Sequence, residues 1–388
     1  MLEFKKGFYV KKIFLSPPHM SGQELELINK VFESNYIAPL GEYVNKFEES
    51  IRNQTKSKNA LALNSGTSAI HLALRVLGVE KGDYVLASTF TFIGSVAPIL
   101  YQNATPIFID ADNSWNLSPK LLQEFLENWT GKMPKAIIVT HLYGQMADMK
   151  KIVEICKKYK IAVIEDSAES LGATLNNQES GTFGEFGIFS FNGNKILTTS
   201  GGGMLIGKNR DLINKAKFLS TQAKEDLPYY EHTEIGFNYR MSNILASVGV
   251  AQMSVLKDRV EKRREIFSWY QEFLSDFVDF MPEIENSKGN RWLTTIQFRD
   301  EVNLDEIIKV FTENGIETRH LWKPMHLQPL FKNSISKIDK TSEKFFKSGL
   351  CLPSGSAMTK EDVKKISKIL QKELLKLGVT KYRLSGQA

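Results

Sequence analysis

Lys195 is the residue whose setting first raises the question of covalent chemistry. It lies in SFNGNKILTTSGGGM (residues 190–204), after small polar residues and shortly before three consecutive glycines, residues 201–203. A lysine amine becomes nucleophilic near neutral pH when burial or a neighbouring charge lowers its pKa. The same sequence pattern would also fit a solvated lysine beside a flexible loop. We expect the glycines to let the backbone turn tightly beneath the lysine and lead into the next strand.

Two more groups of polar residues follow predicted strands. Ser65, Gly66 and Thr67 follow ALAL (60–63) and open a helical pattern, so they could hold a phosphate; a serine N-cap with a turn glycine is the alternative. Asp166 ends IAVIED (161–166), where a buried carboxylate needs a cation or hydrogen-bond donors. A protonated pyridine nitrogen, a magnesium ion or a helix N-terminus would each meet that need.

Short apolar runs that alternate with helical patterns must position these groups. The predicted strands are 60–63, 84–88, 106–110, 136–141, 161–166, 187–191 and 203–207, and the helices between them include 67–77, 118–129 and 149–159. Strands joined by helices form a mostly parallel sheet that is covered on both faces. Because ligands bind at the carboxyl ends of such strands, we expect the polar groups to meet there. The fold class is α/β, with a large domain over residues 1–250.

The pattern changes in the rest of the chain, which we assign to a smaller α+β domain, residues 251–388, that begins with a long linking helix. Residues 241–273 form one long amphipathic stretch with helical spacing. A strand at 292–298, a helix at 304–315 that ends on Gly315, a short strand at 316–322 and a helix at 359–377 follow. The tail, residues 382–388, shows no packing pattern.

Composition excludes several classes of protein. With 42% hydrophobic and 24% charged residues, and no apolar run near the roughly 20 residues of a membrane span, the chain fits a soluble protein. The start shows no signal-peptide pattern, so we expect a cytoplasmic protein. The net charge of +6 is dispersed, and its cluster at 257–265 suits a solvated helix face better than a nucleic acid. Cys156 and Cys351 are too few for a disulfide framework, and no set of metal ligands is predicted.

Two nucleotide-binding motifs are absent from the sequence. No G-x-x-x-x-G-K-[ST] occurs, so the lysine stretch is not a P-loop. GTFGEFG (181–187) has the spacing G-x-x-G-x-x-G, which differs from the dinucleotide fingerprint.

The order of the polar groups is more specific than any one of them. Gly66 and Thr67, then Asp166, then Ser190 and Lys195 lie on one α/β domain. This order resembles the pyridoxal 5′-phosphate (PLP) enzymes of the aspartate aminotransferase fold, fold type I. Motifs along nearly the whole chain, among them SPPHM, SNYIAPLGE, VIEDSAESLGA, FSFNGNKILTTSGGGM, GFNYRMSN and LWKPMH, are similar to the sugar-nucleotide aminotransferases of the DegT/StrS group. Within the group, they look most similar to the 4-aminotransferases of the UDP-N-acetylbacillosamine pathway.

The resemblance implies roles for the matching residues. Lys195 would carry the cofactor through a Schiff base and later move a proton, and Asp166 would keep the pyridinium nitrogen protonated. Glu169 would contact the phenolic oxygen of the ring, at a position where other members often have glutamine or histidine. The other implied cofactor contacts are ring stacking by Phe92, whose alternative is a core aromatic, and phosphate binding by Gly66, Thr67 and Ser190.

The resemblance also implies a homodimer, because Asn238 would reach the phosphate of the neighbouring subunit. Arg240 would bind the carboxylate of the amino donor or a substrate phosphate, with an ion pair at the dimer interface as the alternative. The candidates for the sugar nucleotide are Asn35, Tyr36, Lys323 and His326, of which His326 could equally be a structural histidine.

Lysine at position 195 favours transamination, because relatives with histidine there carry out dehydration. The implied reaction moves an amino group from L-glutamate to C4 of a nucleotide-linked 4-keto-6-deoxy sugar. The preferred substrate is UDP-2-acetamido-4-keto-2,6-dideoxyglucose, which would place the protein in glycan biosynthesis. A GDP- or dTDP-linked 4-keto sugar, as for a perosamine synthase, is the alternative. A hypothesis from a different class of protein is a regulator that binds PLP but catalyses no reaction.

Overall fold

The computed structural model describes residues 12–379. The tail for which no packing was predicted, residues 382–388, lies outside these limits, as do residues 1–11.

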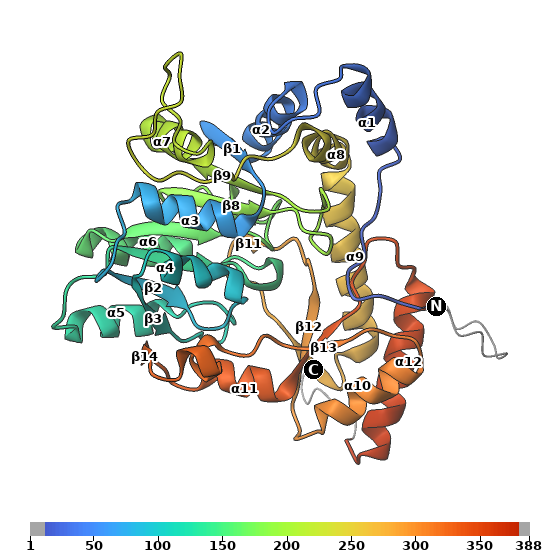
Figure 1. Ribbon diagram of the computed structural model, residues 1–388. Helices are drawn as coiled ribbons and strands as arrows, with labels where there is room; N and C mark the ends of the chain where they lie inside the picture. The colour runs from blue at the N-terminus through green and yellow to red at the C-terminus, as the bar shows by residue number, and fades with distance from the viewer. Residues whose placement is uncertain (1–11, 380–388) are drawn as a thin grey trace.

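A central eight-stranded sheet forms the core of the larger part of the molecule (Figure 1). Its strand order is β1-β9-β8-β5-β4-β2-β3-β14, and every pairing from β8 to β14 is parallel, whereas β9 runs antiparallel to β1 and β8. The strands are β1 (Asn59–Leu63), β2 (Tyr84–Ser88), β3 (Thr105–Ile109), β4 (Ala136–Thr140), β5 (Ala162–Asp166), β8 (Phe186–Ser190), β9 (Gly203–Gly207) and β14 (Ile335–Lys337). The predicted α/β class with a mostly parallel sheet is confirmed.

Helices cover both faces of this sheet, which explains why strands such as β4 are apolar at nearly every position. One face packs against α3 (Gly66–Val76), α4 (Ala97–Tyr101) and α7 (Arg210–Ser220). The other packs against α5 (Pro119–Asn128) and α6 (Met149–Tyr159). Near β1 and β9 that second face is covered by α2 (Glu42–Thr55) and α8 (Asn243–Met253), and α1 (Glu24–Glu33) packs on α8.

The amphipathic stretch 241–273 is two helices rather than one. α8 ends at Met253 and α9 (Leu256–Leu274) begins two residues beyond Ser254, whose hydroxyl donates to the carbonyl of Ala251 at 2.7 Å. α8 packs against α1 and α2, whereas α9 packs against α12 (Lys360–Lys376). The chain changes direction here because the two helices cover different cores.

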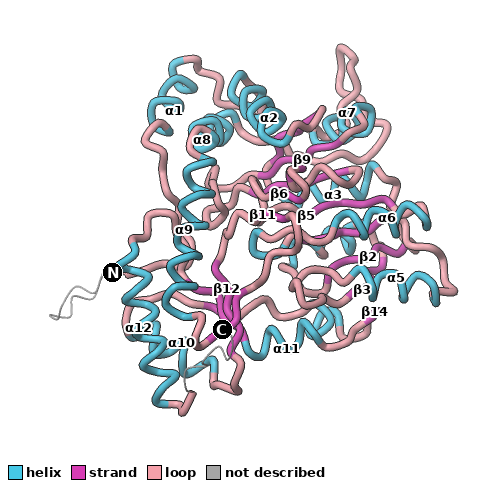
Figure 2. The backbone as a smooth tube through the Cα atoms, turned by 180° about the vertical axis from the view of Figure 1, so that it is seen from behind, coloured by secondary structure: helices cyan, strands magenta, loops and turns pink. Residues whose placement is uncertain are grey.

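A second, antiparallel sheet forms the smaller part of the molecule, with α9 and α12 side by side beside it (Figure 2). Its order is β10-β12-β15-β13, and its core also includes α10 (Leu304–Glu313). The strands are β10 (Val278–Phe280), β12 (Thr294–Phe298), β13 (Arg319–His320) and β15 (Gly349–Leu352). The strand predicted at 316–322 is therefore shorter than expected. A third small sheet joins β6 (Thr174–Leu175), β7 (Gln178–Glu179) and β11 (Ser287–Lys288).

Two segments pack against the part of the molecule on the other side of the domain boundary predicted at residue 250. The boundary itself stays a prediction. β14, from the C-terminal half, pairs with β3 at the edge of the large sheet and is followed by α11 (Thr341–Ser348). In the other direction, Ile13 pairs with Ile316, and the carbonyl of Leu15 accepts from the Ser354 N–H at 2.8 Å. The two parts are thus tied together by backbone pairing in both directions.

None of the helices within residues 12–379 combines the length and the apolar character that a membrane crossing requires. Cys156 and Cys351 are both buried free thiols.

Candidate active site

A cavity of about 370 Å³ lies at the carboxyl ends of the parallel strands, where the sequence predicted a ligand site. Ser190, Asp166 and Thr140 reach it from the ends of β8, β5 and β4. Seven residues predicted to contact the cofactor or react with it line this cavity: Gly66, Thr67, Phe92, Asp166, Glu169, Ser190 and Lys195. The structure therefore brings together groups that are up to 129 positions apart in the sequence, from Gly66 to Lys195.

The N-terminus of α3 forms one wall of the cavity. Ser65 is the N-cap and accepts from the Ser68 N–H at 3.0 Å. The N–H groups of the first turn have no partner within the helix, and they carry the positive end of its dipole. A Cβ on Gly66 would lie 3.2 Å from the Cβ of Ser190, so the glycine leaves space between the helix and β8. Free N–H groups beside the hydroxyls of Thr67 and Ser190 suit an anion such as a phosphate.

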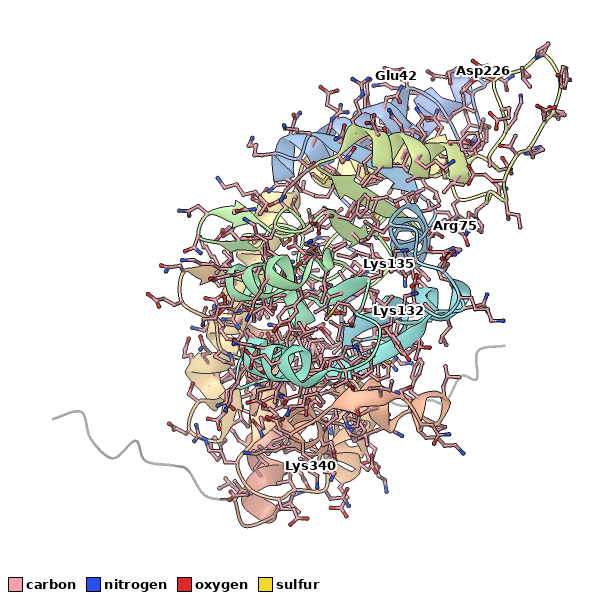
Figure 3. The ribbon with its side chains drawn as sticks, turned by 90° about the vertical axis from the view of Figure 1, so that its left-hand side faces the viewer. Glu42, Arg75, Lys132, Lys135, Asp226 and Lys340 are labelled. Carbon is pink, nitrogen blue, oxygen red and sulfur yellow. The ribbon has the colours of Figure 1, made fainter. Side chains whose placement is uncertain are left out.

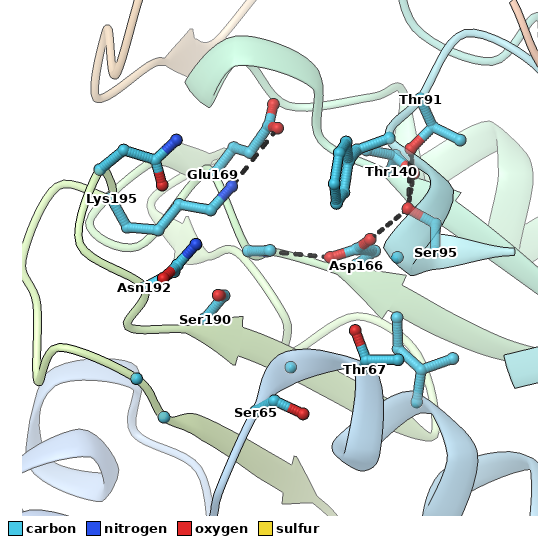
Figure 4. A pocket seen from close by; sticks show the side chains of 18 of the residues that line it. Ser65, Thr67, Thr91, Ser95, Thr140, Asp166, Glu169, Ser190, Asn192 and Lys195 are labelled. Carbon is cyan, nitrogen blue, oxygen red and sulfur yellow. Dashed lines mark hydrogen bonds and ion pairs between the residues drawn. The ribbon is translucent and has the colours of Figure 1, made fainter. Parts of the chain in front are cut away.

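Asp166 is buried and faces the cavity (Figure 4). Ser95 donates to one carboxylate oxygen at 2.5 Å, and the Ala168 N–H donates to the other at 3.1 Å. Ser95 is held by Thr91, which also contacts Thr140 at 2.8 Å. Both donors to Asp166 are neutral, and no ion pair within residues 12–379 involves this carboxylate. The site thus presents a buried negative charge that a cationic ligand atom would stabilise.

Lys195 points toward Glu169 across the cavity (Figure 4). Its Nζ lies 3.5 Å from Glu169 Oε1 and 4.2 Å from the centre of the Trp292 ring, and the lysine side chain is only 13% exposed. The Tyr143 N–H donates to the second oxygen of Glu169 at 2.7 Å. Burial raises the pKa of the Glu169 carboxyl, and the positive charge of Lys195 opposes that shift. Lys195 is therefore an amine enclosed in a cavity, and the solvated alternative does not describe it.

Two of the glycines after Lys195, Gly202 and Gly203, serve close packing rather than the tight turn that we expected. The positive φ in this stretch belongs to Ser200, at +68°. A Cβ on Gly202 would lie 2.4 Å from Thr199 Oγ1, and a Cβ on Gly203 would lie 2.3 Å from the carbonyl carbon of Ser65. β9 can approach the start of α3 only because Gly203 has no side chain.

Several lining residues were missed by the sequence reasoning. Thr91 and Ser95 follow β2, and Thr140 is the last residue of β4, so the rule that pointed to Asp166 would also have pointed to them. Trp292 and Trp322 form aromatic walls together with Phe92, which is 56% exposed. The two tryptophans lie in the C-terminal half, and no sequence signal shows that this half returns to the large sheet.

Asn238 and Arg240 are not among the residues that line the cavity. Asn238 is exposed, and its carbonyl accepts from the Asn64 side chain at 3.3 Å. It follows a segment that projects from one end of the molecule, where Asp226 is labelled (Figure 3). Arg240 donates to the carbonyl of Ala62 at 2.9 Å and forms an ion pair with Glu48 at 3.2 Å. This ion pair lies within one chain. The alternative considered for Arg240 from the sequence was an ion pair between subunits at the dimer interface.

The four candidates for sugar-nucleotide contacts also lie outside the lining. Tyr36 lines a separate hollow beside α1 and α2, and Asn35 precedes it with a φ of +55°. His326 Nδ1 contacts Thr89 Oγ1 at 2.7 Å, and its Nε2 lies 3.5 Å from Glu343 Oε1. The structural interpretation of His326 fits these contacts. Lys323 is partly buried, and its carbonyl accepts from the Gln328 side chain at 3.3 Å.

No group of three or more His, Cys, Asp or Glu side chains in the described part of the chain could hold a metal ion. The cavity is lined by an amine, two carboxylates, several hydroxyls and a helix N-terminus.

Comparisons with known proteins identify the family. The sequence pattern of the DegT/DnrJ/EryC1/StrS aminotransferase family matches residues 18–371. EpsN of Bacillus subtilis (strain 168), which carries the provisional name of a pyridoxal phosphate-dependent aminotransferase, is 52% identical over 93% of this chain and 95% of its own length. GDP-perosamine synthase of Escherichia coli O157:H7 is 35% identical over 91% of this chain and 96% of its own.

A solved structure agrees with these relatives. The crystal structure of a DegT DnrJ EryC1 StrS aminotransferase from Brucella abortus is similar to this chain with a TM-score of 0.85 and 26% identity, over 91% of this chain and 95% of the other. The chain belongs to the DegT/DnrJ/EryC1/StrS family and is a PLP-dependent sugar aminotransferase.

Proposed function

We propose that this aminotransferase moves an amino group from L-glutamate to C4 of a nucleotide-linked 4-keto-6-deoxy sugar. Our preferred substrate is UDP-2-acetamido-4-keto-2,6-dideoxyglucose, whose 4-amino product would serve glycan assembly. The observation that carries the proposal is the meeting of Lys195, Asp166 and the N-terminus of α3 in one cavity.

The residues of the cavity fit PLP. The N–H groups of Gly66 and Thr67, with the hydroxyl of Ser190, would hold the phosphate, and the missing Cβ of Gly66 leaves room for it. Asp166 has neutral donors only, so the protonated ring nitrogen would supply its cationic partner. Phe92 offers an exposed aromatic face, and Glu169 would contact the phenolic oxygen. PLP, when bound, supplies an electron sink for the amino group that is transferred.

The chain's own residues then have distinct tasks. Asp166 would keep the ring nitrogen of the bound cofactor protonated, and Ser95 and Ala168 hold the two carboxylate oxygens of Asp166 in place. The Lys195 amine would hold the cofactor, and its Nζ would carry a proton to and from the substrate carbon. Glu169 Oε1 lies 3.5 Å from that Nζ and would orient the amine. The indole rings of Trp292 and Trp322 limit access of water to the amine.

The nucleotide is the least constrained part of the proposal. The similarity to a GDP-perosamine synthase supports a GDP-linked 4-keto sugar as the second candidate. Specificity depends on the few side chains that contact the base and the sugar. A glutamate-dependent assay across UDP-, GDP- and dTDP-linked 4-keto sugars, with the products identified by NMR, tests the choice. Turnover of the UDP-linked sugar at least about tenfold above the others, in kcat/KM, is expected.

The same assay tests the regulator hypothesis. A protein that binds PLP but does not convert it to the amino form with glutamate, and that aminates none of the sugars, would contradict the proposed reaction.

We also propose that the enzyme is a homodimer in which Asn238 of one subunit contacts the cofactor phosphate of the other. Asn238 is exposed and does not line the cavity of its own chain, which supports this arrangement. Mixing inactive Lys195→Ala protein with inactive Asn238→Ala protein should restore part of the activity, because hybrid dimers would hold one intact site. Mixed dimers without any recovery would contradict the shared site.

A further inference from the structure

Arg263 is a buried positive charge without a carboxylate partner. It lies in α9 and is 1% exposed, and no ion pair within residues 12–379 involves it. Its guanidinium donates to the carbonyl of Trp292 and, at 2.9 Å, to Ser16 Oγ. Burial, together with the charge of Arg259, lowers the pKa of Arg263 to about 9, so the group is still charged at neutral pH. Since burying a charge beside neutral acceptors is costly, this arrangement calls for a functional explanation.

Both partners of Arg263 lead to the same backbone atom. Ser16 Oγ donates to the carbonyl of Asn194 at 2.6 Å, and the indole Nε1 of Trp292 donates to that carbonyl at 2.7 Å. Asn194 is the residue directly before Lys195. The guanidinium therefore holds, through two hydrogen-bonded routes, the backbone from which the lysine side chain extends.

Trp292 also contacts the reactive end of the lysine. The Nζ of Lys195 lies 4.2 Å from the centre of the indole ring, within the range of a cation–π interaction. The backbone of Trp292 is fixed in turn by Asn290, which accepts from the backbone N–H of Trp292 at 2.8 Å and donates to the carbonyl of Glu169 at 2.9 Å. The indole thus sets the position of the amine relative to Glu169.

We propose that Arg263 is a positioning residue for Lys195, acting through Trp292 and Ser16 on the carbonyl of Asn194. A lysine side chain has several rotatable bonds. Its amine therefore occupies a productive position for much of the time only if the backbone and the neighbouring Trp292 ring are fixed. A misplacement of about 1 Å can cost about 100-fold in rate. The inference rests on the proposed function of Lys195 as the lysine that binds the cofactor.

The test measures how fast the apoenzyme captures PLP, independently of any sugar. The Lys195 amine condenses with the PLP aldehyde and releases one water, and the visible absorption of the lysine-bound cofactor reports the rate. Arg263→Met should slow capture about 10- to 100-fold and lower kcat by a similar factor, with a change in sugar KM below about threefold. Arg263→Lys, which keeps a positive donor, should recover part of both losses.

A matched control comes from the same helix. Tyr270 is buried on α9, its hydroxyl donates to the carbonyl of Pro353 at 2.9 Å, and neither residue lines the cavity. Tyr270→Phe removes a buried hydrogen bond without touching Asn194 or Trp292. It should lower thermal stability while leaving the capture rate of the folded protein within about twofold. Equal slowing by Tyr270→Phe and Arg263→Met would overturn the proposal, because a general loss of packing would then explain both.

Two smaller changes keep the proposal testable if Arg263→Met does not fold. Ser16→Ala and Trp292→Phe each remove one hydrogen bond to the carbonyl of Asn194, and each should slow capture by about 3- to 10-fold. Capture at the native rate in both would overturn the proposal. Lys195→Ala separates the two levels of the argument: capture by that variant at the native rate would contradict the proposed function itself. Loss there with native rates in the other variants would contradict only the role of Arg263.

Discussion

Glu165 and Asp166 are adjacent on β5, yet they lie in two regions with opposite chemistry. Glu165 is completely buried on the side away from the cavity and accepts from His141 Nε2 at 3.0 Å. Three backbone N–H groups also donate to it: Gly181 at 3.0 Å, Phe183 at 2.6 Å and Gly184 at 2.7 Å. Asp166 has one hydroxyl donor and one backbone donor, and it faces the cavity.

The difference shows that the supply of donors, rather than burial, separates a structural carboxylate from one that is available to a ligand. The Ala147 N–H donates to His141 Nδ1 at 3.2 Å, so the ring proton is on Nε2 and points at Glu165. The chain itself therefore satisfies Glu165. Asp166 can still accept from a ligand, because neighbouring residues of a strand point to opposite faces of the sheet. Changes on the cavity side should affect chemistry, and changes at Glu165 should affect stability.

The largest effect on the cavity side is expected from Lys195→Ala. Without the amine, no group in the cavity can bind the cofactor covalently or carry the proton, so turnover should fall by at least about 10⁴-fold. The melting temperature of the apoenzyme should change little, because the side chain ends in a cavity. Turnover assays and the visible spectrum check this. Native-like activity in the variant would show that the reaction does not take place in this cavity.

Asp166→Asn keeps the shape of the side chain and removes its charge. The ring nitrogen would lose its anionic partner, so we expect kcat to fall about 100- to 1,000-fold. Ser95 can still donate to the amide oxygen, which should limit the loss of folding stability to about 1 kcal/mol. Steady-state kinetics and denaturant unfolding measure the two effects. A variant that loses folding stability but keeps its kcat would show that Asp166, like Glu165, is a structural carboxylate.

Glu165→Gln should give the opposite pattern. The amide nitrogen of glutamine cannot accept from the backbone N–H groups that now surround the carboxylate. We expect the free energy of unfolding to fall by about 3 kcal/mol, with kcat of the folded fraction within about threefold of the native value. A thermally stable variant with a large drop in kcat would break the comparison.

Glu169→Gln should produce the smallest effect and refine the comparison, because Glu169 is buried on the cavity side. Burial raises the pKa of the Glu169 carboxyl, so the folded state retains a proton that the unfolded state releases. Stability from this group is complete below its ordinary pKa and is lost as the pH rises through the raised value. The slope is at most about 1.4 kcal/mol per pH unit. Unfolding of the two apoenzymes between pH 4 and 8 should give a smaller slope for the glutamine variant.

Much of the large sheet followed from the sequence, because each strand there is a short apolar run with polar residues at its end. Lys195, Asp166, Gly66 and Ser190 could be grouped for the same reason, since the ends of parallel strands meet at one edge. The break between α8 and α9 could not be predicted, because both halves have helical spacing. Only their packing on different cores separates them.

The sequence by itself determined the family, the α/β order of elements and the groups that line one edge of the sheet, because these depend on local periodicity and short motifs. Tertiary structure alone decided that Trp292 and Trp322 line the cavity of Lys195 and that Arg263 hydrogen-bonds to Trp292, since all three come from segments at least 68 positions beyond the lysine. It also assigned opposite roles to Glu165 and Asp166. Which donors and charges meet at a side chain depends on contacts between distant segments, and no local pattern encodes them.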